Sequence, residues 1–105
     1  KGSLYYDVPG LCDWINGKIK DGTVETAWLK IHEASLTVLD ELGTREQVSD
    51  ARWEAVLRFA SLREWQPALY VSNLHPDEFR VFYGERVFDR VMRGTVFELS
   101  GESRR

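Results

Sequence analysis

The fold is decided by a short stretch near the middle of the 105-residue chain, residues 36–41, which read LTVLDE. The stretch is a compact apolar run that ends on two acids. A run of this kind fits a strand that is buried on both faces of a parallel sheet. Because ligands in open α/β sheets lie beyond the carboxyl ends of the strands, this strand would present Asp40 and Glu41 at a ligand-binding edge.

Three more segments indicate strands, one before this stretch and two after it. Residues 4–8 (LYYDV) and 95–99 (TVFEL) are rich in the aromatic and β-branched residues that strands favour. Residues 68–71 (ALYV) form another apolar segment, which ends on Ser72 and Asn73. This strand would therefore also present polar side chains at its carboxyl end.

Amphipathic segments separate these strands and predict helices. Asp7 can cap the first helix and Pro9 can open it, and Ser49 can cap a longer helix that runs to Arg63. The apolar side chains that would face the core recur at helical spacing: Leu11, Trp14, Ile15 and Ile19; Val24, Ala27, Trp28 and Ile31; Trp53, Val56, Leu57 and Ala60; Phe79 and Phe82; Val87, Phe88 and Val91. The alternation predicts an α/β fold with a mainly parallel sheet flanked by helices.

Length and composition indicate the class of protein. Residues 1–105 suffice for one small domain, and 43% hydrophobic with 30% charged residues is typical of a soluble globular chain. We find no apolar run near the roughly 18 residues that span a membrane, and no signal peptide. The single cysteine, Cys12, excludes an internal disulfide and fits a small buried hydrophobe in a reducing, cytoplasmic setting.

Charge is distributed unevenly along the chain, whose net charge is −3. From residue 80 to the end, six arginines stand against four acids, so this part is net +2. Arginine suits bidentate contact with phosphate or carboxylate, and such residues could serve DNA or a subunit interface. The alternative is a solvated, ion-paired surface. All four tryptophans fit packing better than base stacking: Trp14, Trp28, Trp53 and Trp65.

The two central strand ends carry residue types that ATP hydrolysis needs. Asp40 could hold the magnesium ion that bridges the phosphates, and Glu41 could orient or activate the attacking water. Asn73, beside Ser72, could orient the same water by hydrogen bonding. The alternatives are a solvated strand end or helix cap for the acids and an ordinary turn for Asn73.

Four segments resemble, in order and spacing, the motifs of AAA+ ATPases of the DnaC/IstB-like family of helicase loaders and transposition helpers. Residues 36–43 are similar to the Walker B segment and residues 70–74 to the sensor 1 strand. Residues 84–91 (GERVFDRV) resemble the box with the arginine finger, and residues 96–105 resemble the closing strand and sensor 2 motif. Together the four segments cover essentially the whole chain.

For the sheet edge, the resemblance implies roles residue by residue. Asp40 would coordinate magnesium, Glu41 would be the catalytic base or water-positioning acid, and Asn73 would be sensor 1. Ser72, next to sensor 1, would contribute to the nucleotide site.

The resemblance also implies roles for the arginines. Arg90 would be the arginine finger, acting on ATP held by the neighbouring subunit, with Arg86 as a second candidate. Arg105 matches the sensor 2 position, with Arg104 as the candidate one residue away. From the residues alone, the alternative for Arg86 and Arg90 is pairing along one helix with the neighbouring acids at 85 and 89.

One element of the family is missing. The family has a glycine-rich Walker A loop between a first strand and a helix, and these residues contain no such loop. Residues 1–2 would be the tail of the missing helix. Because the missing strand lies in the middle of the family's sheet, we expect a split sheet and a chain that is marginal, oligomeric or paired with another chain.

Three functional interpretations follow. The first is a helicase loader or transposition helper that uses ATP and Mg²⁺ in the parent protein, forms homo-oligomers, binds DNA and delivers a replicative helicase or a transposase. The second is a non-catalytic assembly or binding module derived from the AAA+ fold. The third is an unrelated α/β interaction domain. Under the first, this chain alone would be inactive because it lacks the loop that grips the nucleotide.

Overall fold

The computed structural model describes residues 2–43 and 49–93, in which three strands alternate with five helices. The elements are β1 (Ser3–Asp7), α1 (Val8–Asp21), α2 (Val24–Glu33), β2 (Leu36–Leu42), α3 (Asp50–Leu62), β3 (Ala68–Ser72), α4 (Pro76–Tyr83) and α5 (Glu85–Val91). Their order confirms the predicted alternation as far as α5. The strand predicted at 95–99, together with Arg104 and Arg105, lies outside the described residues.

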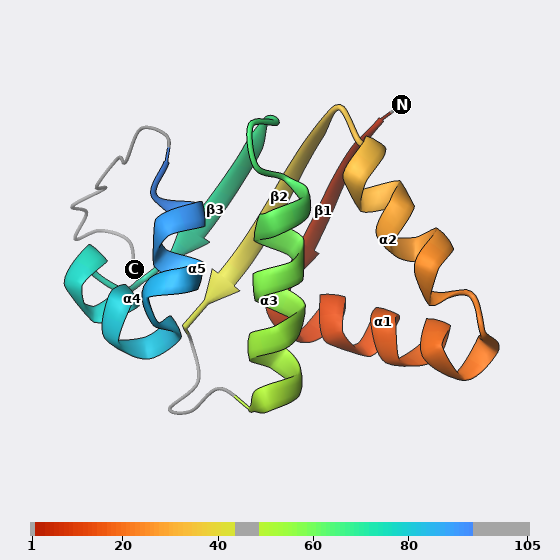
Figure 1. Ribbon diagram of the computed structural model, residues 1–105, viewed down its shortest axis with the longest axis horizontal. Coiled ribbons are helices and arrows are strands. Elements are labelled where there is room, and N and C mark those ends of the chain that lie inside the picture. The colour runs from red at the N-terminus through yellow and green to blue at the C-terminus, as the bar shows by residue number, and fades with distance from the viewer. Residues whose placement is uncertain (1, 44–48, 94–105) are drawn as a thin grey trace, which may run out of the picture.

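The strands form one parallel sheet in the order β1-β2-β3, with β2 in the centre. The predicted parallel α/β fold is therefore confirmed. β2 pairs directly with both β1 and β3, so the expected split does not fall between any of the described strands. Their carboxyl ends share one edge, which lies at the arrowheads in Figure 1.

The helices form a layer on one face of this sheet. Figure 1 shows α3 crossing in front of β2, and α3 packs against both α1 and α5. Leu39 of β2 and Val56 and Phe59 of α3 are completely buried in the resulting core. Burying a side chain of this size contributes roughly 1.5–3 kcal/mol, so contacts of this kind hold the layers together.

The opposite face of the sheet is uncovered in the described part of the chain. Tyr5, Val38 and Leu69 are in register across the three strands and therefore share that face. Tyr5 is 61% exposed and Leu69 is 53% exposed, and Leu36 and Val71 on the same face are exposed as well. Parallel sheets are nearly always covered on both faces, so the exposure of this apolar face is unusual.

Helix ends follow the capping signals in the sequence. The Asp7 carboxylate accepts a hydrogen bond from the backbone N–H of Gly10 at 2.6 Å, which caps α1, and Ser49 caps α3 in the same way. Gly22 ends α1 at φ 76°, and Gly84 separates α4 from α5 at φ 91°. Both glycines occupy a region of backbone conformation that other residues rarely adopt.

Arg63, directly after α3, is a large side chain that is almost completely buried. Its guanidinium donates hydrogen bonds to the carbonyls of Ile31 (3.1 Å), His32 (3.2 Å), Ala34 (2.8 Å) and Pro67 (2.5 Å). Ile31 and His32 lie in the last turn of α2 and Ala34 is its C-cap, so these three carbonyls are at the helix end where the dipole favours a cation. One side chain therefore ties the α2–β2 connection to the segment that leads into β3.

Two expectations about packing were wrong. Trp65 is 82% exposed, and the guanidinium of Arg93 lies over its ring at 4.9 Å from the centroid. Trp65 follows the end of α3 in a turn at φ 67°, which directs the ring outward. Ile19 is 57% exposed because it lies in the last turn of α1, away from the sheet.

Cys12 is buried, as predicted. Among the described helices, none is long and apolar enough to cross a membrane.

Tyr70 of β3 should make the stability of the fold sensitive to alkaline pH. Burial raises the pKa of Tyr70 from 10.0 to about 12. Because the unfolded chain releases this proton at lower pH, stability should fall as the pH rises from about 10 towards 12. In the Tyr70→Phe variant, the free energy of unfolding should fall by on the order of 2 kcal/mol less over this pH range than in the wild type. Urea unfolding at several pH values measures the difference. An unchanged pH dependence in the variant would contradict this assignment.

Candidate active site

Asp40, the predicted magnesium ligand, and Glu41, the predicted catalytic acid, lie at the carboxyl end of β2. The sequence predicted a strand that ends on these two acids, and β2 runs through both of them and ends one residue later, at Leu42. A register shift against β3 falls between Leu39 and Leu42, and Glu41 within it adopts φ 61°. This irregularity places a non-glycine residue in the left-handed region, which costs on the order of 1 kcal/mol; such residues cluster at functional sites but also occur in turns, as at Trp65.

Asp40 is held by hydrogen bonds on both carboxylate oxygens. Its Oδ1 accepts from the backbone N–H of Glu41 at 2.7 Å, and its Oδ2 accepts from the hydroxyl of Tyr5 at 2.5 Å. The hydrogen bond to Asp40 raises the pKa of Tyr5 to about 12, because loss of the proton would place two negative charges side by side.

Sequence reasoning missed Tyr5 as a site residue. The signal that could have found it is register: Tyr5 pairs with Val38, and residues two apart along a strand point to the same face. Asp40 is two residues after Val38, so a long side chain at position 5 can reach it. Without the strand pairing, the sequence could not distinguish Tyr5 from Tyr6.

Ser72 and Asn73 lie at the same edge as the acids, as predicted. Ser72 pairs with Leu42, and its hydroxyl donates to the Leu42 carbonyl at 2.7 Å and accepts from the backbone N–H of Leu74 at 3.1 Å. The serine therefore joins β2 to β3 and fixes the turn that follows. Asn73 comes directly after β3 and is exposed, so its amide is accessible at the edge.

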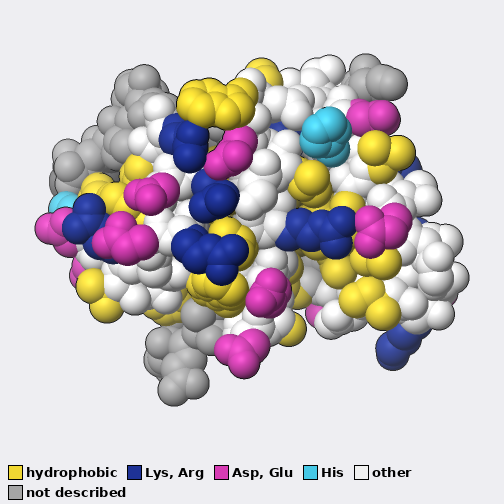
Figure 2. All heavy atoms as spheres, viewed as in Figure 1, with side chains coloured by type: hydrophobic (Ala, Val, Ile, Leu, Met, Phe, Trp, Pro, Cys, Tyr) yellow, Lys and Arg dark blue, Asp and Glu magenta, His cyan; other side chains and the backbone are white. Residues whose placement is uncertain are grey.

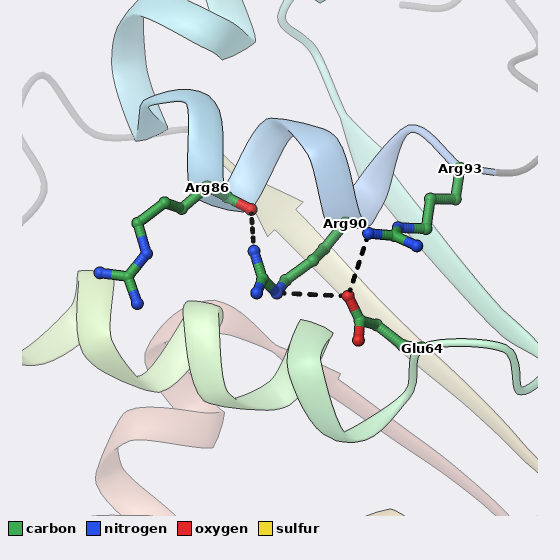
Figure 3. Close-up of polar contacts among 4 residues, drawn as sticks. All are labelled: Glu64, Arg86, Arg90 and Arg93. Atoms are coloured by element: carbon green, nitrogen blue, oxygen red, sulfur yellow. Dashed lines mark hydrogen bonds and ion pairs between the residues drawn. The ribbon is translucent and has the colours of Figure 1, made fainter.

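A second group of candidate residues lies on α5 and at the end of α3. Figure 3 shows Arg90 and Arg93 directed towards Glu64, while Arg86 points the other way. The Nε of Arg90 and an Nη of Arg93 each lie 3.4 Å from the same Glu64 oxygen, and Arg90 also donates to the Arg86 carbonyl at 2.9 Å. The Arg86 guanidinium lies 5.7 Å from the ring centroid of Trp53.

This arrangement differs from the pairing along α5 that the sequence left open. Arg90 pairs with Glu64 of a different segment, and Glu85 pairs with Arg80 of α4 at 3.3 Å. The Arg90–Glu64 side chains are 28% and 25% exposed. A partly exposed pair of this kind is worth only about 1 kcal/mol or less, so another anion could replace Glu64 at little cost.

The fold does not bring Arg90 and Asp40 together within one chain. Glu64, the partner of Arg90, lies four positions before the first residue of β3, at the amino-terminal end of the strand. Asp40 lies at the carboxyl end of the sheet, and α5 is on the helical face. Figure 2 shows basic side chains gathered on this helical face, over α5 and α3. Arg90 and Arg93 therefore lie towards the amino-terminal end of the strands, away from the Asp40 edge.

The donor set at the edge fits a hydrated cation. Within residues 2–43 and 49–93 there is no cluster of three or more His, Cys, Asp or Glu side chains that could enclose a metal ion. Asp40 alone would suit Mg²⁺, which keeps several waters and is usually held by one or two carboxylates together with substrate phosphates. Each Asp40 oxygen keeps an acceptor position beyond its one hydrogen bond.

Comparison with known proteins supports the fold. No protein-family model and no curated protein sequence matches this chain. Among solved structures, the crystal structure of the DnaC helicase loader is similar, with a TM-score of 0.74 over 85% of this chain, at 17% sequence identity. The match covers 55% of that protein's chain, so the present chain corresponds to about half of it. The likeness shows that this chain shares the parallel α/β fold of that part of the structure.

Proposed function

We propose that these residues belong to an ATPase of the AAA+ class, of the helicase-loader or transposition-helper type. The observation that carries the proposal is the edge at which Asp40 and Glu41 lie beside Ser72 and Asn73. This edge lies at the carboxyl ends of parallel strands, where open α/β folds bind ligands. The similarity of the fold to a helicase loader supports the same function.

The side chains at the edge have distinct chemical roles in this proposal. Asp40 accepts hydrogen bonds from the water shell of Mg²⁺ or binds the ion directly. Glu41 takes a proton from the attacking water, and Asn73 orients that water by hydrogen bonding. Bound MgATP supplies the γ-phosphoryl group that is transferred to water. The Ser72 hydroxyl keeps β2 and β3 together and so holds the acids and Asn73 at a fixed spacing.

Arg90 acts in trans in this proposal. It leaves Glu64 and binds the γ-phosphate held at the Asp40 edge of a neighbouring subunit, with Arg86 as the second cation nearby. This arrangement requires head-to-tail contact between copies, because the two groups lie at opposite ends of the sheet. It also fits the weak pairing of Arg90 in a single chain.

The partners of the complete protein follow from the same assignment. We propose that it works in the cytoplasm, binds DNA and delivers a replicative helicase or a transposase, and that Arg105 contacts the nucleotide as sensor 2. The second candidate function is a non-catalytic assembly module. It would hold if the complete protein carries no Gly-x-x-x-x-Gly-Lys-Ser/Thr sequence to hold the phosphates, a sequence that does not occur within these 105 residues.

Substitution of Glu41 tests the proposal. In the full-length protein we expect Glu41→Gln to lower ATP hydrolysis by at least about 10²-fold while nucleotide binding persists, because only the base is removed. Hydrolysis is measured by phosphate release and binding by a fluorescent ATP analogue. Glu33→Gln, an exposed acid on α2, is the matched control and should behave as wild type. A wild-type protein that binds no nucleotide would support the non-catalytic module instead.

A further inference from the structure

Tyr5 contributes a hydroxyl to the proposed metal ligand from a neighbouring strand. Its oxygen lies 2.5 Å from Oδ2 of Asp40, and the two residues are 35 positions apart in sequence. The contact exists because β1 and β2 pair in parallel with Tyr5 beside Val38. The hydrogen bond from Tyr5 therefore ties the Asp40 carboxylate to the neighbouring strand β1.

Asp40 would be free to rotate without this contact. Its other hydrogen bond comes from the backbone N–H of Glu41, which is the next residue and lies at the irregular end of the strand. That bond alone holds Oδ1, and the carboxylate could still rotate so that Oδ2 changes position. The tyrosine hydroxyl holds Oδ2 from a regular strand, so both oxygens become oriented.

We propose that Tyr5 is a positioning residue that holds the Asp40 carboxylate in the orientation needed to bind the hydrated magnesium ion of MgATP. The inference rests on the proposed function, because it assumes that Asp40 is the metal-binding carboxylate. Groups that hydrogen-bond to a metal ligand orient it, and their loss typically weakens metal binding or activity by about 10–100-fold. Tyr5 would act through Asp40 and would not touch the reacting atoms.

The chain contains a closely matched control. Tyr6 follows on the same strand, points to the opposite face and stacks on Trp14 with ring centroids 5.2 Å apart. Tyr5→Phe and Tyr6→Phe remove the same atom from adjacent residues, but only the first removes a hydrogen bond to Asp40. Because Tyr5 is 61% exposed, Tyr5→Phe should leave the fold intact, which circular dichroism would check.

The test measures metal binding in the full-length protein with a non-hydrolysable ATP analogue. Mn²⁺ replaces Mg²⁺ as the probe, and loss of the free Mn²⁺ signal in electron paramagnetic resonance gives its affinity. We expect Tyr5→Phe to weaken Mn²⁺ binding by about 10-fold, with unchanged affinity for the analogue in excess metal. Tyr6→Phe should bind Mn²⁺ as wild type does, and Asp40→Asn should bind it more weakly than Tyr5→Phe.

Three results would overturn the inference, each in a different way. If Asp40→Asn loses metal affinity while Tyr5→Phe keeps it, Asp40 is the ligand but Tyr5 does not position it. If Asp40→Asn itself binds Mn²⁺ as wild type does, the metal role of Asp40 in the proposed function fails and the role of Tyr5 fails with it. An equal loss in Tyr5→Phe and Tyr6→Phe would also count against a specific role.

Discussion

Replacing Arg90 with alanine should lower ATP turnover by about 10³-fold or more in an assembly of the full-length protein, while nucleotide affinity stays within a few-fold of wild type. An arginine supplied to the γ-phosphate by a neighbouring subunit stabilises the charge of the transition state and contributes little to ground-state binding. Turnover is measured by steady-state phosphate release, and affinity by titration with a fluorescent ATP analogue.

Arg93→Ala is the matched control for this experiment. Arg93 follows α5, carries the same charge and shares the Glu64 oxygen with Arg90 at 3.4 Å. If only Arg90 reaches the nucleotide, Arg93→Ala should keep turnover within a few-fold of wild type. Equal losses in both variants would indicate that the charge of this surface, and not a specific finger, supports activity.

Mixed assemblies test whether Arg90 acts across an interface. Subunits with Arg90→Ala still carry Glu41, and subunits with Glu41→Gln still carry Arg90. When the two inactive variants are mixed, some interfaces combine an intact Glu41 with an intact Arg90, and hydrolysis should return to a measurable fraction of wild type. If mixing restores no activity although both variants bind nucleotide and assemble, action in trans is ruled out.

Replacing Arg63 with methionine is expected to lower the free energy of unfolding by about 3–5 kcal/mol. The side chain is 2% exposed, and methionine would fill much of its volume without offering a donor. The carbonyls of Ile31, Ala34 and Pro67 would each lose the hydrogen bond from the guanidinium, and those of Ile31 and Pro67 would keep only their longer backbone bonds, at 3.5 and 3.3 Å. Since small domains are stable by only about 5–15 kcal/mol, urea unfolding should show a large shift in midpoint.

Arg58→Met is the control for the loss of an arginine. Arg58 pairs with Glu25 at 2.9 Å on the surface and lies over the Trp28 ring, and its side chain is 45% exposed. Losing an exposed pair and one cation–π contact should cost about 1 kcal/mol. Arg63→Lys should fall between the two, because an ammonium group reaches fewer of the carbonyls. If Arg63→Met costs no more than Arg58→Met, the buried hydrogen bonds do not stabilise the fold as described.

Local signals in the sequence predicted the elements well because those signals act over a few residues. Asp7 and Ser49 cap helices through contacts with their immediate neighbours, and the structure confirms both. The run at 36–39 predicted the central strand for the same reason. The burial of a side chain depends on which elements become its neighbours, and local signals do not report this. Trp65 was predicted to pack in the core, but it is exposed, and among the described contacts only Arg93 lies over its ring.

Candidate site residues could be predicted only in part. Asp40, Glu41 and Asn73 follow apolar runs, so a shared sheet edge was predictable once the strands were recognised as parallel. The contacts of Tyr5 with Asp40 and of Arg90 with Glu64 join residues 35 and 26 positions apart, and depend on which strands and helices become neighbours. From sequence spacing, the possible partners of Arg90 were the acids of its own helix. Helical periodicity does not show that Glu64, just after α3, lies next to α5.

Glu41 also bears on how this protein can change over evolutionary time. At φ 61° a side chain is strained by on the order of 1 kcal/mol, and glycine would adopt the same backbone shape without that strain. Selection for folding alone would therefore favour glycine at this position, while selection for hydrolysis would favour glutamate. Under the proposed ATPase function, a lineage that lost hydrolysis would be free to exchange one for the other, so the residue at position 41 would separate active from inactive lineages.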